Sequence, residues 1–155
     1  MKSCFFIGHR DLSENYFPAL AAAVALHIKE YGVTDFLVGN YGAFDRMVAK
    51  AVMQAKQQFP HITLTLLLPY HPGERPVILP PYFDGSFYPP GMEKVPHKLA
   101  ILRANRYAVQ HSDYLIAAVW HPASNARNLL EYAQTLAARG FLQICNICQE
   151  KGTPR

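Results

Sequence analysis

Short apolar runs alternate with helical stripes along nearly the whole chain. Runs of strand length lie at residues 3–8, 35–39, 62–68, 114–120 and 141–147. Between them, apolar residues recur at the three- and four-residue spacing of amphipathic helices. This alternation predicts an α/β fold, a Rossmann-like three-layer sandwich with a mainly parallel central sheet.

Capping and breaking residues place the expected helices. Ser13 is a candidate cap for the first helix, and Gly32 ends it. The second helix stops before Pro60, because proline cannot continue a helix. A third helix is expected over residues 96–111, and Gly140 ends the last.

The length of 155 residues suits one domain with its own core. We expect that domain at residues 1–149, followed by a flexible tail at 150–155. Half of the residues are apolar and 17% are charged, which is typical of a globular chain. No apolar stretch reaches membrane-spanning length, and the first residues do not resemble a signal peptide. Three cysteines favour a reducing compartment, so we expect a cytoplasmic protein.

The formal net charge of +4 agrees with an anionic ligand. The basic residues are scattered, so the charge does not require nucleic acid. Cys145 and Cys148 form a CxxC pair without a second pair, and the histidines lack ligand spacing. We therefore expect no metal and no cofactor.

Residues 70–92 interrupt the alternation with many prolines and five aromatic residues. A loop of this length inside a compact domain is uncommon and is often a lid or a binding loop. The alternative is an aromatic loop that packs over the sheet edge or against a partner subunit. The segment also has room for an irregular strand around residues 82–88.

Three loops follow strands of the predicted sheet, at the edge where open parallel sheets bind ligands. The first contains Gly8, His9 and Arg10. Glycine lets the backbone approach a ligand closely, while His and Arg offer donors to phosphate or carboxylate. The alternative is that Arg10 pairs with Asp11 or Asp45 while His9 only packs.

The second loop contains Gly39, Asn40 and Gly42, and a helix with Asp45 in its first turn follows at once. Free backbone N–H groups and the helix dipole favour an anion at such a helix start. The loop matches neither the Walker pattern nor GxGxxG. The alternative is a tight turn in which Asp45 complements the helix dipole.

The third loop spans residues 121–128, where Ser124 or Asn125 can cap the last helix. Helical spacing places Arg127 and Glu131 one turn apart on one face. The alternative is a cap with an exposed ion pair. The convergence of three such loops on one sheet edge favours a binding site over three unrelated turns.

Two further residues complete the predicted site: Arg106, near the end of the third helix, and Asn128, in the last helix. Arg106 has the alternative of lying on a solvated helix face. The predicted ligand-binding residues are Gly8, His9, Arg10, Gly39, Asn40, Gly42, Asp45, Arg106, Ser124, Asn125 and Asn128.

Four segments resemble small bacterial proteins of the SLOG superfamily, the group of the DNA-processing protein Smf/DprA and the LOG (lonely guy) enzymes. Residues 4–10 resemble its "FTGHR" start, and residues 39–45 resemble its "GxxxGxD" loop. Residues 103–117 are similar to "RNRYMVDHSDRLIAV", and residues 128–133 resemble "NTVRYA". The resemblance implies a Rossmann-like sheet with a pocket for nucleotides or their derivatives.

The chain departs from the family pattern at several positions. The family usually has Gly-Gly-Thr where this chain has Ser124-Asn125-Ala126, and Ile7 replaces a threonine. Glu131 takes the place of the working glutamate of the LOG enzymes, which cleave a base from a ribose phosphate. Their partner arginine aligns with Ala104, so the resemblance does not favour the same reaction.

Three hypotheses follow. The first is binding of a nucleotide or nucleotide-derived small molecule, in the role of a sensor. The second is an N-glycosidic, phosphoribohydrolase-like hydrolase in which Glu131 is the catalytic residue. The third is nucleic-acid binding of the DprA kind, which we rank below the small molecule. We also expect a homo-oligomer and no membrane partner.

Overall fold

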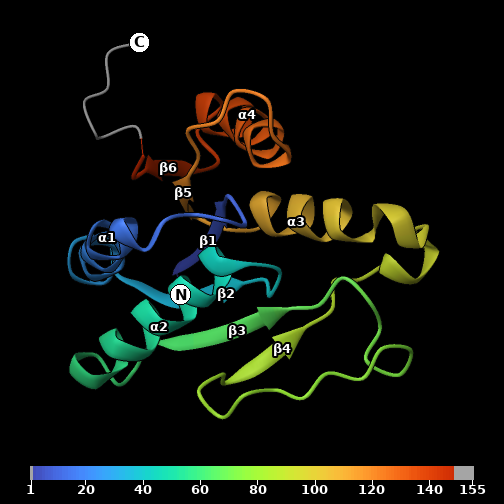
Figure 1. Ribbon diagram of the computed structural model, residues 1–155, viewed down its shortest axis with the longest axis horizontal. Coiled ribbons are helices and arrows are strands. Elements are labelled where there is room, and N and C mark those ends of the chain that lie inside the picture. The colour runs from blue at the N-terminus through green and yellow to red at the C-terminus, as the bar shows by residue number, and fades with distance from the viewer. Residues whose placement is uncertain (1, 149–155) are drawn as a thin grey trace.

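The computed structural model of the chain describes residues 2–148 and shows a sheet of six parallel strands with helices on both faces (Figure 1). The strand order is β4-β3-β2-β1-β5-β6. The strands are β1 (Lys2–Gly8), β2 (Val33–Val38), β3 (Thr63–Leu67), β4 (Gly85–Phe87), β5 (Tyr114–Ala118) and β6 (Gln143–Asn146). The expected Rossmann-like α/β sandwich is confirmed. The tail expected at 150–155 lies outside the described residues.

Two helices cover each face of the sheet. They are α1 (Phe17–Lys29) and α2 (Ala43–Gln58) on one face, and α3 (Ala100–Gln110) and α4 (Asn125–Ala138) on the other. In β1, Phe6 packs with the first helix pair while Phe5 packs with the second. A strand with both faces covered must be apolar at every position, which explains its unbroken apolar run.

Strand β5 ends at Ala118, two residues earlier than expected. Beyond it, the backbone of Val119 hydrogen-bonds to the side-chain amide of Asn146. Asn146 Oδ1 accepts from Val119 N at 3.2 Å, and Nδ2 donates to Val119 O at 2.9 Å. Trp120 therefore lies in the loop after the strand.

The capping residues act largely as expected. Ser13 Oγ accepts from Asn15 N at 3.1 Å and starts a short 3₁₀ turn, which leads into α1. Gly32 and Gly140 have φ values of 71° and 83°, the left-handed conformation that favours glycine after a helix. The helix expected over 96–111 begins as a separate 3₁₀ turn, so α3 itself is shorter.

The strand expected around residues 82–88 is present as β4, which pairs parallel with β3. Asp84, the residue before β4, holds the start of this strand against β3. The Asp84 carboxylate accepts from Leu64 N at 2.8 Å and from Lys56 Nζ at 2.6 Å. Hydrogen bonds from Lys56 and Leu64 outweigh the opposing effect of partial burial, so the pKa of Asp84 is lowered. Half-buried aromatic side chains of residues 70–92 pack against both cores: Phe83 on one face, and Tyr70, Phe87 and Tyr88 on the other. These contacts favour a packing role for much of the segment.

No helix within residues 2–148 is both long enough and apolar enough to cross a membrane.

His27 gives the fold a testable pH dependence. It is 2% exposed, its Nδ1–H donates to Ala23 O at 2.7 Å, and its ring meets Tyr31 and Tyr114 edge-on. Burial lowers its pKa from 6.5, while the bond to Ala23 opposes this. The unfolded chain therefore binds more protons just below pH 6.5, and folding free energy is lost as the pH falls from there.

We expect His27→Phe to flatten the dependence of the unfolding free energy on pH between about 6.5 and 5. Urea unfolding at a series of pH values measures it, with the exposed His61→Phe as control. An unchanged slope in His27→Phe would contradict a neutral, buried His27.

Candidate functional site at the switch point of the sheet

The strand order creates a switch point between β1 and β5. From β1 the chain builds β2, β3 and β4 on one side, and then returns to place β5 and β6 on the other. Gly8, the last residue of β1, pairs with Ala118, the last residue of β5. The loops that follow these strands therefore start side by side and then separate. Ligands of open α/β sheets bind at this kind of crevice.

His9 joins the two loops. Its Nε2 accepts from Trp120 N and from His121 N, both at 3.1 Å, and its side chain is 8% exposed. Because two N–H donors converge on Nε2, that nitrogen carries no proton, and the proton of the neutral ring is on Nδ1. Burial lowers the pKa of His9; Asp11 opposes this, and the positive charges nearby reinforce it. The neutral tautomer with Nδ1–H is thus the favoured form.

The Nδ1–H group of His9 is a donor without an acceptor. It has no hydrogen-bond partner among residues 2–148. The group is reachable from solvent. Within that range the Thr34 hydroxyl is the only polar side-chain atom that is both fully buried and without a partner, so the unpaired Nδ1 of His9 is not fully buried. His9 was predicted to donate to a ligand; one of its nitrogens instead accepts from the backbone, and the other remains available as a donor.

Helix α4 begins directly after the loop that follows β5. Ser124 is the N-cap: its Oγ accepts from Arg127 N at 3.0 Å, and its carbonyl accepts from Asn128 N at 3.1 Å. The N–H groups of Asn125 and Ala126 have no hydrogen-bond partner within the described part of the chain. Two free amides at the positive end of a helix favour an anion.

Arg127 is half-buried beside this helix start. Its Nε donates to His121 O at 3.4 Å, which holds the guanidinium against the loop. Glu131, one turn further along α4, is exposed. Arg127 and Glu131 form no ion pair in the structure of residues 2–148.

The second predicted loop is tied to the first. Ala43 N donates to Arg10 O at 2.7 Å, so the first amide of α2 is already used. A Cβ at Gly42 would lie 2.8 Å from the Arg10 Cα. Glycine is required there by the contact between two loops, which is a structural reason and does not need a ligand.

Asp45 and Tyr41 complete that second loop. Asp45 Oδ2 accepts from Tyr41 N at 2.9 Å, and a Cβ at Gly39 would lie 3.3 Å from the same oxygen. Burial raises the pKa of Asp45, against the bond from Tyr41 and the charge of Arg10. Burial also raises the pKa of Tyr41 to about 12. Asn40 is exposed between these residues.

The alternative pairing of Arg10 is not observed. Among residues 2–148, Arg10 forms no ion pair with Asp11 or Asp45. Its side chain is exposed at the carboxyl edge of the sheet.

Arg106 does not join the loops. Its guanidinium lies over the Tyr132 ring of α4, 4.7 Å from the ring centroid. It lies six residues into α3, about 9 Å along the helix axis from the first residue of that helix. The contact with Tyr132 gives it a role between the two helices.

Sequence reasoning missed Trp120. It was taken as the last residue of a strand, whereas it stands in the switch-point loop and is 56% exposed. The available signal was its position directly before the His-Pro pair that opens the loop.

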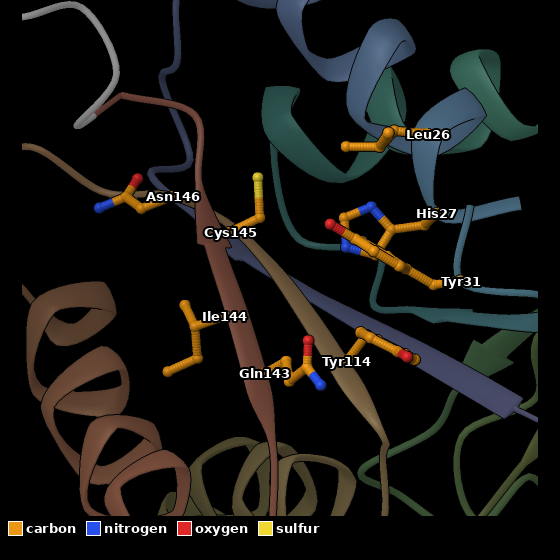
Figure 2. A pocket seen from close by; sticks show the side chains of 8 residues that line it. All are labelled: Leu26, His27, Tyr31, Tyr114, Gln143, Ile144, Cys145 and Asn146. Atoms are coloured by element: carbon orange, nitrogen blue, oxygen red, sulfur yellow. The ribbon is translucent and has the colours of Figure 1, made fainter. Parts of the chain in front are cut away.

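Two surface hollows lie elsewhere, on either side of β6. One, of about 400 Å³, lies between β6, the end of α1 and the start of β5 (Figure 2). Its lining residues are Leu26, His27, Tyr31, Tyr114, Gln143, Ile144, Cys145 and Asn146. The other, of about 480 Å³, lies between β6 and α4. Both arise because β6 is an edge strand, and neither contains a residue of the three predicted loops.

The chain matches no protein-family model, and a search of curated proteins gave no significant match.

Proposed function

We propose that this protein binds a nucleotide or nucleotide-derived small molecule through its phosphate at the switch point between β1 and β5. The observation that carries the proposal is the state of His9. It ties the two loops together through Nε2 and leaves Nδ1–H as an unpaired donor at the surface. A donor that is held in one tautomer, reachable from solvent and without a protein acceptor suits an anionic oxygen.

The surrounding groups support an anion. The free amides of Asn125 and Ala126 and the guanidinium of Arg127 are in the first turn of α4, which directly follows the loop whose two amides donate to His9. Arg10 adds a further exposed cation at the edge. The resemblance of residues 4–10 and 128–133 to the SLOG superfamily supports a nucleotide over other anions.

Binding without turnover is the form of the proposal that the contacts favour. Hydrolysis of the LOG kind needs an acid or base poised beside a partner arginine. Glu131 is exposed and forms no ion pair with Arg127 within residues 2–148. We expect no appreciable release of base from AMP.

We expect Arg127→Gln to weaken AMP binding by roughly tenfold or more, since hydrogen bonds to charged groups contribute about 1.5–3 kcal/mol. Calorimetric titration at low salt with AMP, GMP and an oligothymidine measures it. Arg103→Gln is the matched control, because it removes the same charge from an exposed position on α3.

Equal losses of AMP affinity in both variants would show only a general charge effect. Absence of AMP and GMP binding to the wild type would overturn the proposal, and tight binding of oligothymidine alone would favour the nucleic-acid hypothesis.

The expected homo-oligomer stays a prediction, because the structure is that of one chain. Light scattering on the purified protein tests it directly.

A further inference from the structure

Trp120 is the single tryptophan of the chain and stands in the loop after β5, with 56% of its surface exposed. Exposing an indole to water forgoes the free energy of burying one of the largest apolar side chains. None of the loop residues of 119–124 besides Trp120 is a large exposed apolar residue. Exposure alone does not single out Trp120, since Phe141 is 61% exposed, so the case for a ligand rests on what surrounds the indole.

The ring is held in place although it is exposed. The backbone N–H of Trp120 donates to His9 Nε2 at 3.1 Å. The His9 ring meets the indole at 72°, with centroids 5.3 Å apart, and the His121 ring is also 5.3 Å away. An aromatic surface fixed in this way loses little conformational entropy when a ligand binds.

The indole of Trp120 also contacts His9, one of the donors of the proposed phosphate site. His9, which contacts its ring, carries the unpaired Nδ1–H, and the free amides of Asn125 and Ala126 follow in the first turn of α4. Apolar aromatic surface and anion donors thus occur together around one buried histidine. A ligand that uses both would carry a planar aromatic group and an anionic group, which the proposed function takes to be a phosphate.

We infer that Trp120 is the platform on which the base of the bound ligand stacks, so that the ligand class is a mononucleotide or another base-bearing phosphate and not a sugar phosphate. This inference rests on the proposed function, because it assigns the second half of the same site. Stacking of a base on an aromatic side chain is worth roughly tenfold or more in affinity. The phosphate contacts alone would leave the site open to any phosphate ester.

The test compares AMP, ribose 5-phosphate and inorganic phosphate on the wild type, Trp120→Ala and Trp120→Phe. Because there is one tryptophan, its fluorescence in the wild type reports contact with the base directly, and calorimetry gives the affinities of all three proteins. We expect AMP to quench the fluorescence and to bind at least about tenfold more tightly than ribose 5-phosphate. Trp120→Ala should lose that advantage while binding ribose 5-phosphate as the wild type does, and Trp120→Phe should keep most of it. Phe141→Ala removes an equally exposed aromatic residue beside β6 and is the control.

The two failures can be told apart. If AMP and ribose 5-phosphate bind the wild type equally, or if Trp120→Ala keeps the full preference for AMP, the platform is overturned while the phosphate site stands. If none of the three compounds binds the wild type, the proposed function fails and the inference fails with it. Should Trp120→Ala not fold, the wild-type comparison and Trp120→Phe still decide.

Discussion

His9→Phe is expected to lower the free energy of unfolding by about 2–4 kcal/mol, because it leaves two backbone donors without an acceptor. Phenylalanine keeps an aromatic ring at position 9 but cannot accept hydrogen bonds, so the variant removes those to Trp120 N and His121 N. Each unpaired donor that stays buried costs about 1–3 kcal/mol. Urea unfolding near pH 7.5 measures the change, at a pH where His9 is neutral because burial lowers its pKa.

His9→Gln is the matched variant. A glutamine oxygen reaches about as far from the backbone as Nε2 and can accept from the same two amides, so this variant should recover more than half of the lost stability. The two variants also separate the roles of the two nitrogens, since glutamine does not present a ring N–H from the Nδ1 position. If His9→Phe were as stable as the wild type, the hydrogen bonds between the β1 and β5 loops would contribute nothing to stability, and His9 would not be held as a fixed donor.

The sheet could be predicted because its signals are local. A strand covered on both faces is apolar along its buried positions, so β1 and β5 are visible as runs without reference to the rest of the chain. The short edge strand β4 was visible only as an aromatic cluster, because three residues carry no period of their own. The end of β5 was predicted two residues too late. The backbone of Val119 hydrogen-bonds to the side chain of Asn146, which is 27 residues away and gives no local signal.

For the candidate site, the juxtaposition of two loops was predictable from the sequence, and their contacts were not. Topology places the loops after β1 and β5 together, which the order of strands and helices already implied. The direction of the His9 hydrogen bonds was not predictable, since they join residues 111 and 112 positions apart. Gly42 illustrates the same limit: a glycine before a helix predicts an anion site, whereas the close approach to Arg10 is a tertiary contact. Sequence patterns show which groups reach an edge, and packing decides what they bind there.

Gly8→Ala is the second substitution with a large expected effect. A Cβ at this position would lie 2.6 Å from Cγ of Phe44 and within 2.8 Å of both of its Cδ atoms. The Phe44 ring is 1% exposed in the core beneath α2, so it cannot swing into solvent to make room. Overpacking of a filled core lowers the free energy of unfolding by about 1–3 kcal/mol. Because the new methyl group would meet three ring atoms, we expect Gly8→Ala at the upper end of that range. Gly85→Ala is the control, because a Cβ there has no atom within 4 Å.

The double variant Gly8→Ala/Phe44→Leu tests whether the ring is the cause. Leucine removes ring atoms from the space that the new methyl group needs, so the two changes together should cost less than the sum of the single changes. We expect a coupling free energy of at least about 1 kcal/mol, measured by urea unfolding of all four proteins. Additive effects would mean that Gly8 is required for some other reason. A ligand that approaches the backbone at the end of β1 is the remaining one, and AMP binding to a folded Gly8→Ala protein would then be the property that changes.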